Sequence, residues 1–138
     1  MDRQNSYISN NKDVLSYESL GSKLIDGARN QFWLAPMAGI TDVCFRQLMD
    51  EMGAGVLVSE LVSAKGLLYN SGKTHKMIEV HPKSKSLVGI QLFGESEEDI
   101  INAAHYVKEA GASFVDINLG CPVKKVVKKG CLLYTSDA

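Results

Sequence analysis

The sequence has little of what defines several specialised classes of protein. Its three cysteines, Cys44, Cys121 and Cys131, form no CxxC pair, so neither a zinc knuckle nor a disulfide framework is expected. The three histidines also lack the spacing of metal ligands, and we expect no metal site. No apolar run approaches the roughly 20 residues that cross a bilayer, and the first residues contain no signal-peptide core. We therefore expect a cytoplasmic chain without a membrane segment.

A net charge of either sign is also nearly absent, since 15 Lys and Arg residues are balanced by 16 Asp and Glu residues. The formal net charge of −1 argues against a globally basic nucleic-acid coat, although a local basic patch is still compatible with RNA binding. Hydrophobic residues make up 45% of the 138 positions and charged residues 22%, which is the composition of one ordinary globular domain.

The hydrophobic pattern changes along the chain. Residues 1–20 are rich in Asn, Ser and Asp without a period, and we expect them to form a disordered tail. From Leu20 onward, short apolar runs alternate with helical periods, which is typical of βαβ units around a parallel sheet. The runs predict four strands, over residues 32–37, 55–59, 87–93 and 114–119.

The first helix is predicted between the first two strands. Thr41 is expected to cap it so that it begins at about residue 42, and Gly53 is placed to end it. Its expected buried stripe repeats at i, i+4 and i+8 and consists of Cys44, Leu48 and Met52.

The later helices have signals of different strength. Residues 60–77 carry only a weak pattern for one or two short helices. Ser96 and the three acids after it are a capping signature and predict a helix that ends at Gly111. The expected inner face of this helix consists of Ile100, Ala104 and Val107.

Four strands and three connections within residues 32–119 fit two α/β architectures. One is an open doubly wound sheet, and the other is the first half of a (β/α)8 barrel, which when complete needs about 250 residues. In both architectures the site lies at the carboxyl ends of the parallel strands.

Two amide side chains fall at neighbouring strand ends in this reading. Gln91 and Asn118 can each donate and accept hydrogen bonds, which suits a heterocycle with alternating N–H and C=O groups, such as a flavin. The plainer interpretation is that the two amides only satisfy backbone groups of the loops.

Cys121 lies in a Gly-Cys-Pro turn just after the fourth predicted strand. A protonated thiol at the mouth of the site is a competent proton donor, whereas the adjacent Lys124 and Lys125 favour a nucleophilic or redox role instead. The four lysines of residues 124–129 form a basic stretch that suits RNA phosphates or a solvated face.

Four segments together resemble the bacterial type of tRNA-dihydrouridine synthase: LAPMAGITDVCFRQLMDEMGAG (34–55), VSE (58–60), VGIQLFG (88–94) and VDINLGCPVKKVVKKG (115–130). The resemblance implies a flavin-binding (β/α)8 TIM barrel, truncated here after its fourth strand, with residues 21–130 as a partial catalytic domain. It also implies that FMN, recharged by NADPH, reduces the C5=C6 bond of selected uridines in tRNA.

The resemblance assigns roles to individual residues of this sequence. Contacts to the FMN are implied for five of them, namely Pro36, Met37, Ala38, Gln91 and Asn118. Cys121 would be the general acid that protonates uracil C5 after hydride has reached C6. Lys124 and Lys125, beside this cysteine, are the expected RNA contacts.

The sequence departs from the family pattern after Gly130, and residues 131–138 are expected to be a non-native or truncated tail. Because a half barrel has two unpaired strand edges, we expect the 138-residue chain to be inactive alone, and marginal or aggregation-prone unless it dimerises. Two alternatives stay open: another FMN barrel of the dihydroorotate-dehydrogenase type, and a non-catalytic RNA-binding fragment. The lysine-rich stretch favours RNA over a small acid, and pure phosphate binding needs neither Cys121 nor the two amides.

Overall fold

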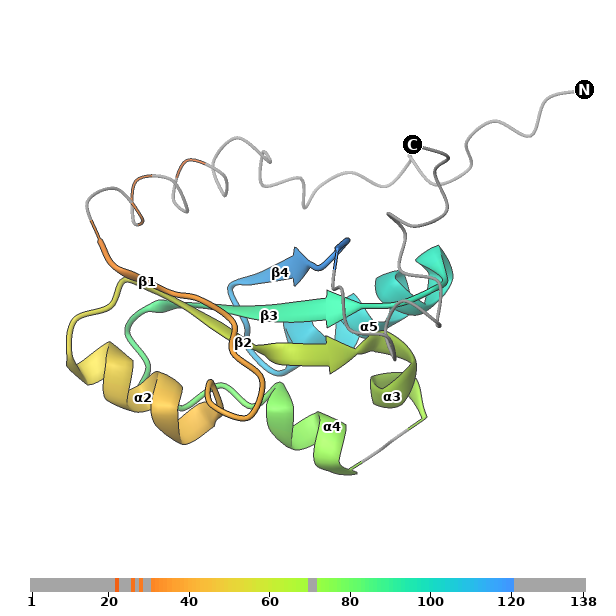
Figure 1. Cartoon of the computed structure of the whole chain (residues 1–138), viewed down its shortest axis with the longest axis horizontal. Coiled ribbons are helices and arrows are strands. Elements are labelled where there is room, and N and C mark those ends of the chain that lie inside the picture. The colour runs from red at the N-terminus through yellow and green to blue at the C-terminus, as the bar shows by residue number, and fades with distance from the viewer. Residues whose placement is uncertain (1–21, 23–25, 27, 29–30, 70–71, 121–138) are drawn as a thin grey trace, which may run out of the picture.

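The computed structural model describes residues 22, 26, 28, 31–69 and 72–120. The predicted tail over 1–20 and the last eight residues lie outside them. Four parallel strands form one sheet in the order β1-β2-β3-β4 (Figure 1). The strands are β1 (Trp33–Leu34), β2 (Val56–Ser63), β3 (Leu87–Phe93) and β4 (Phe114–Ile117). The helices are α2 (Val43–Glu51), α3 (Ala64–Leu68), α4 (Gly72–Met77) and α5 (Glu97–Glu109).

The strand order distinguishes between the two expected architectures. A doubly wound sheet reverses its order at a switch point, whereas the strands of a (β/α)8 barrel follow one another around the sheet. The four described strands are neighbours in sequence order without a reversal. The described residues therefore form an α/β fold consistent with the first half of a TIM barrel. None of the described helices is both long and apolar enough to cross a membrane.

Strand β3 and helix α5 confirm the sequence prediction most closely. β3 spans the predicted residues, and α5 begins after Ser96, whose side chain accepts a hydrogen bond from the backbone N–H of Asp99. Gly111 has a φ of 85°, a left-handed conformation that glycine adopts without strain, and it follows the end of the helix. The buried residues are Ile100, Ala103 and Val107, while the predicted Ala104 is only partly buried.

Helix α2 buries a different face from the predicted one. Leu48 and Met52 are 51% and 72% exposed, and Cys44 is an exposed free thiol. The helix instead turns Arg46 inward, and its neighbours Phe45 and Met49 pack against the core. The N-cap is residue 42, one position later than predicted, because its carboxylate accepts the Phe45 N–H at 2.8 Å.

The lengths of the other strands also differ from the prediction. β1 has two residues, and β4 ends at Ile117, before the predicted limit. β2 continues past Ser59 to Ser63, and its register with β3 shifts between Val58 and Leu61, which marks a β-bulge. Residues 60–77, where one or two short helices were expected, contain the two short helices α3 and α4, apart from residues 70 and 71, which are not described.

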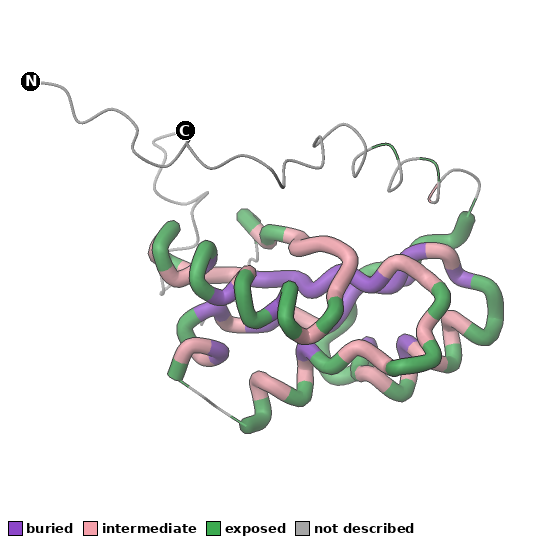
Figure 2. The backbone as a smooth tube through the Cα atoms, turned by 180° about the vertical axis from the view of Figure 1, so that it is seen from behind, coloured by how far each residue is buried: buried purple, intermediate pink, exposed green. Residues whose placement is uncertain are grey.

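The two faces of the sheet have different roles. Val88, Ile90 and Leu92 belong to the hydrophobic core, which includes side chains of α3 and α5. Because side chains alternate along a strand, Gly89 and Gln91 lie on the opposite face. Buried residues are concentrated in the central strands β2 and β3 (Figure 2). The face that carries Gln91 therefore stays available for a site at the carboxyl end of the sheet.

Candidate functional site

The two amides predicted at the carboxyl end of the sheet lie in contact. Asn118 follows the end of β4, and its Nδ2 donates a hydrogen bond to Oε1 of Gln91 at 3.3 Å. Gln91 lies within β3 rather than at its end, and only 8% of it is exposed. Parallel pairing of β3 with β4 thus brings together two residues that are 27 positions apart.

A carboxylate joins this pair. Asp116 is the register partner of Gln91 across β3 and β4, and its Oδ2 accepts a hydrogen bond from Gln91 Nε2 at 2.6 Å. Asp116 and Asn118 are two positions apart, so they lie on the same side of the chain as it leaves the strand. At the other end of the group, the backbone N–H of Gly120 donates to Asn118 Oδ1 at 3.1 Å. We call Gln91, Asp116 and Asn118 the amide–carboxylate group.

The bulge in β2 connects the amide–carboxylate group to the neighbouring strand. The buried Ser59 accepts the backbone N–H of Gln91 at 3.0 Å and donates to the carbonyl of Glu60 at 2.8 Å. The Glu60 side chain then accepts a hydrogen bond from the backbone N–H of Gly39. Hydrogen bonds to the backbone and to the side chain of Glu60 therefore connect β3, across β2, with the loop that follows β1.

That loop contains Pro36, Met37 and Ala38, all of which are exposed. The buried Thr41 closes it: its hydroxyl accepts the N–H of Met37 and donates to the Met37 carbonyl, both at 3.1 Å. Gly39 has a φ of 76°, which glycine adopts without the strain that a side chain would bring. The three predicted contact residues are thus held on a tight turn beside the carboxyl end of the sheet.

A buried arginine supports the same turn from behind. Arg46 is 3% exposed, and its guanidinium donates to the carbonyl of Thr41 at 2.7 Å and to the carbonyl of Glu79. Burial lowers the pKa of Arg46, and the carboxylates of Asp42, Glu60 and Glu79 oppose this shift. Because the guanidinium bonds two backbone carbonyls that are far apart in sequence, it ties the turn after β1 to the segment after α4.

The other predicted site residues are Cys121, Lys124 and Lys125, and they lie outside the described residues. Gly120 is the last described residue before them, and its backbone N–H donates a hydrogen bond to the Asn118 side chain. Among the described residues, no group of three or more His, Cys, Asp or Glu side chains is arranged to hold a metal ion.

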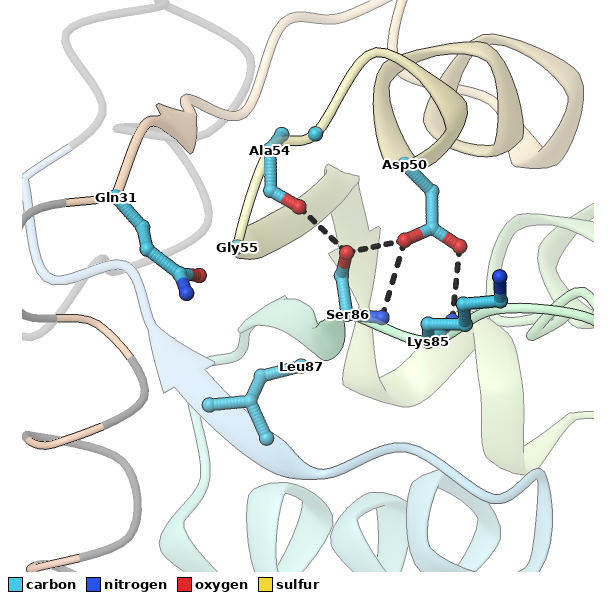
Figure 3. A pocket seen from close by; sticks show the side chains of 8 residues that line it. Gln31, Asp50, Ala54, Gly55, Lys85, Ser86 and Leu87 are labelled. Atoms are coloured by element: carbon cyan, nitrogen blue, oxygen red, sulfur yellow. Dashed lines mark hydrogen bonds between the residues drawn. The ribbon is translucent and has the colours of Figure 1, made fainter.

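An open cleft of about 450 Å³ lies at the opposite, amino-terminal edge of β2 and β3 (Figure 3). The main polar groups that line this cleft form hydrogen bonds with each other. Asp50 accepts the backbone N–H groups of Lys85 at 2.9 Å and Ser86 at 3.1 Å, and also the Ser86 hydroxyl, which in addition contacts the Ala54 carbonyl. In (β/α)8 folds the amino-terminal face serves stability, and we interpret this cleft in the same way.

The pKa of Asp50 reflects these contacts. Partial desolvation acts to raise it, but the hydrogen bonds from the Ser86 side chain and from the Lys85 and Ser86 backbone outweigh that effect. The net result is a pKa below the usual value for aspartate. Asp50 therefore ties the end of α2 to the start of β3 as a charged acceptor.

Sequence reasoning missed Asp116 and misjudged Thr41. The signal for Asp116 is its spacing of two from Asn118, which places both polar side chains on one face of a strand. Thr41 was expected to be a helix cap, but it is wholly buried and bonds the turn before the helix. The role of Asp116 depends on the register of β3 with β4, and the role of Thr41 depends on the path of the loop after β1. Neither role can therefore be predicted from the sequence alone.

Comparisons with known proteins agree with the resemblance. The profile of the dihydrouridine synthase (Dus) family matches residues 33–138. The chain is 43% identical over 101 residues to tRNA-dihydrouridine synthase B of Escherichia coli (strain K12) and of Shigella flexneri, and 44% identical to that of Pseudomonas putida (strain KT2440). These alignments cover 73% of this chain but only 30–31% of each relative. The chain belongs to the dihydrouridine synthase family.

Proposed function

We propose that this chain supplies the first half of the catalytic barrel of an enzyme that reduces uridine to 5,6-dihydrouridine in tRNA. Family membership and the activity in the names of the relatives, tRNA-dihydrouridine synthase B, support the reaction. The observation that carries the proposal to this chain is the amide–carboxylate group at the carboxyl end of the sheet, beside the exposed turn of residues 36–38.

The chemistry of these residues fits a flavin ring, and we propose FMN as the cofactor and NADPH as its reductant. The ring has alternating N–H and C=O groups, and the two amides offer donors and acceptors side by side on neighbouring strands. Pro36, Met37 and Ala38 are proposed to lie against the ring, because their turn is exposed and restrained by Thr41. When bound, the flavin supplies hydride to C6 of the uracil.

The proton at C5 is proposed to come from Cys121. This residue is three positions after Asn118 in the sequence, and Asn118 is one of the two proposed ring contacts. A positioned thiol acts as a general acid if it is protonated and within hydrogen-bond reach of the carbon that accepts the proton. Lys124 and Lys125 are proposed to bind the RNA backbone, since lysine ammonium groups pair with phosphates.

The test is dihydrouridine formation on unmodified tRNA by a full-length protein that carries these residues. Cys121→Ala is expected to keep the bound flavin, measured by its absorption spectrum, and to lose at least about 100-fold in dihydrouridine formation, the usual scale of general acid catalysis. Cys44→Ala is the matched control, because Cys44 is an exposed thiol on α2. Unchanged turnover in Cys121→Ala would refute the acid assignment, and absence of flavin from the unmodified protein would refute the cofactor.

A further inference from the structure

Three hydrogen bonds that involve side chains of the amide–carboxylate group run in one direction. Gly120 N–H donates to Asn118 Oδ1, Asn118 Nδ2 donates to Gln91 Oε1, and Gln91 Nε2 donates to Asp116. The contact with Asp116 is the shortest of the three, at 2.6 Å against 3.1 Å and 3.3 Å.

The two ends of this line cannot be reversed. A backbone N–H only donates, and an ionised carboxylate only accepts. A side-chain amide, by contrast, exchanges its donor and acceptor ends when it turns by 180° about its last bond. The orientations of Gln91 and Asn118 are therefore set from outside, by Gly120 at one end and by Asp116 at the other.

We propose that Asp116 is a positioning residue that fixes the orientation of the Gln91 amide, and so decides which side of it donates and which accepts toward a ligand. Among the described residues, the contacts leave a second hydrogen on Gln91 Nε2 and a second lone pair on Oε1. In the reversed orientation the same two positions would have the opposite hydrogen-bonding character. The inference rests on the proposed function for the identity of that ligand, a flavin ring, but not for the orientation itself.

The size of the effect follows from the type of bond. A hydrogen bond to a charged acceptor is stronger than one between neutral groups, so its loss removes most of the bias toward one orientation. The affinity for a ligand falls in proportion to the fraction of molecules in the competent orientation. Equal populations of the two orientations weaken binding about 2-fold, and a preference for the reversed one weakens it about 10-fold or more.

The first measurement needs no cofactor. In a ¹⁵N-labelled full-length protein that carries these residues, the two Gln91 Nε2 protons are expected to be widely separated in chemical shift, because one of them faces a carboxylate. Asp116→Asn keeps the shape of the side chain but removes the charged acceptor, and it is expected to bring the two shifts together. Asp99→Asn makes the same chemical change in the first turn of α5 and is expected to leave the Gln91 signals unchanged. Asp116→Glu also changes this position but retains a carboxylate, and it is expected to keep the wide separation of the two shifts. A change seen in Asp116→Asn alone would therefore report the lost charge and not a lost fold.

The second measurement is an FMN titration of the same variants in the full-length protein that carries these residues. Unchanged Gln91 signals in Asp116→Asn would overturn the inference. Altered signals with an FMN affinity equal to that of the unmodified chain would overturn the role in ligand binding. Altered signals in a full-length protein that binds no FMN would support the orientation by Asp116 and count against the proposed function. Altered signals together with a 2- to 10-fold weaker affinity would support both.

Discussion

Replacement of Asp50 by asparagine tests the connection between α2 and β3 in Figure 3. The aspartate accepts hydrogen bonds from Lys85 N–H, Ser86 N–H and the Ser86 hydroxyl, with both carboxylate oxygens engaged. Asparagine has one acceptor oxygen, so at least one of these donors faces an N–H group instead. Loss of a hydrogen bond to a charged acceptor costs about 1.5–3 kcal/mol in a buried setting. Since Asp50 is partly exposed and water can replace it, we expect about 1–2 kcal/mol less stability.

The assay is urea unfolding of the 138-residue chain, followed by the fluorescence of Trp33, its single tryptophan. With a denaturant dependence of about 2 kcal/mol per molar urea, the expected loss lowers the midpoint by about 0.5–1 M. Glu109→Gln removes one charge from an exposed position at the end of α5 and serves as the matched control, with a change within about 0.5 kcal/mol.

The pH dependence provides a second check on Asp50. A carboxylate whose pKa is lowered by folding contributes stability above its unfolded pKa and loses it as the pH falls through its folded pKa. The difference between the unmodified chain and Asp50→Asn is therefore expected to be full at pH 7 and to close below the usual aspartate value of 3.8. A difference at pH 7 no larger than that of the control, or one that persists undiminished in acid, would refute the reasoning.

Two further substitutions test packing and the turn after β1. Gly89→Ala places a Cβ at 2.3 Å from the Phe114 ring and is expected to lower the free energy of unfolding in urea by about 1–3 kcal/mol. The control is Gly72→Ala, whose Cβ meets no described atom within 4 Å, and it is expected to be nearly neutral. Equal effects of the two substitutions would contradict this packing. Arg46→Met keeps much of the side-chain volume but removes the hydrogen bonds to both backbone carbonyls. We therefore expect faster hydrogen exchange at the backbone N–H of Thr41. Unchanged protection of this N–H would show that the guanidinium does not hold the turn.

Local signals predicted β3 and α5 well. The bounds of β3 are readable because a short apolar run lies between polar and glycine residues. The start and end of α5 are readable because Ser96 bonds a backbone N–H three residues later and Gly111 adopts a positive φ. Signals of this kind act within a few residues, so no knowledge of the rest of the fold is required.

The buried face of α2 was not predictable in the same way. The helix carries two apolar sets: Cys44, Leu48 and Met52 on one side, and Phe45 with Met49 on another. Their spacing is equally helical, and the choice between them depends on which side meets the sheet. The structure selects the side of Phe45 and Met49 and buries the charged Arg46 beside them, because two distant backbone carbonyls satisfy its guanidinium.

Some features of the candidate site could likewise be predicted from the sequence, and others could not. Amides at neighbouring strands, and a turn with proline and glycine after the first strand, are properties of the sequence alone, as is the family resemblance. The contact of Gln91 with Asp116 and Asn118, and the bulge that joins them through Ser59 to the first loop, depend on strand register. Register is a relation between segments that are 25–32 residues apart in these contacts. It is set by how strands and helices pack, and for that reason only the tertiary structure decides it.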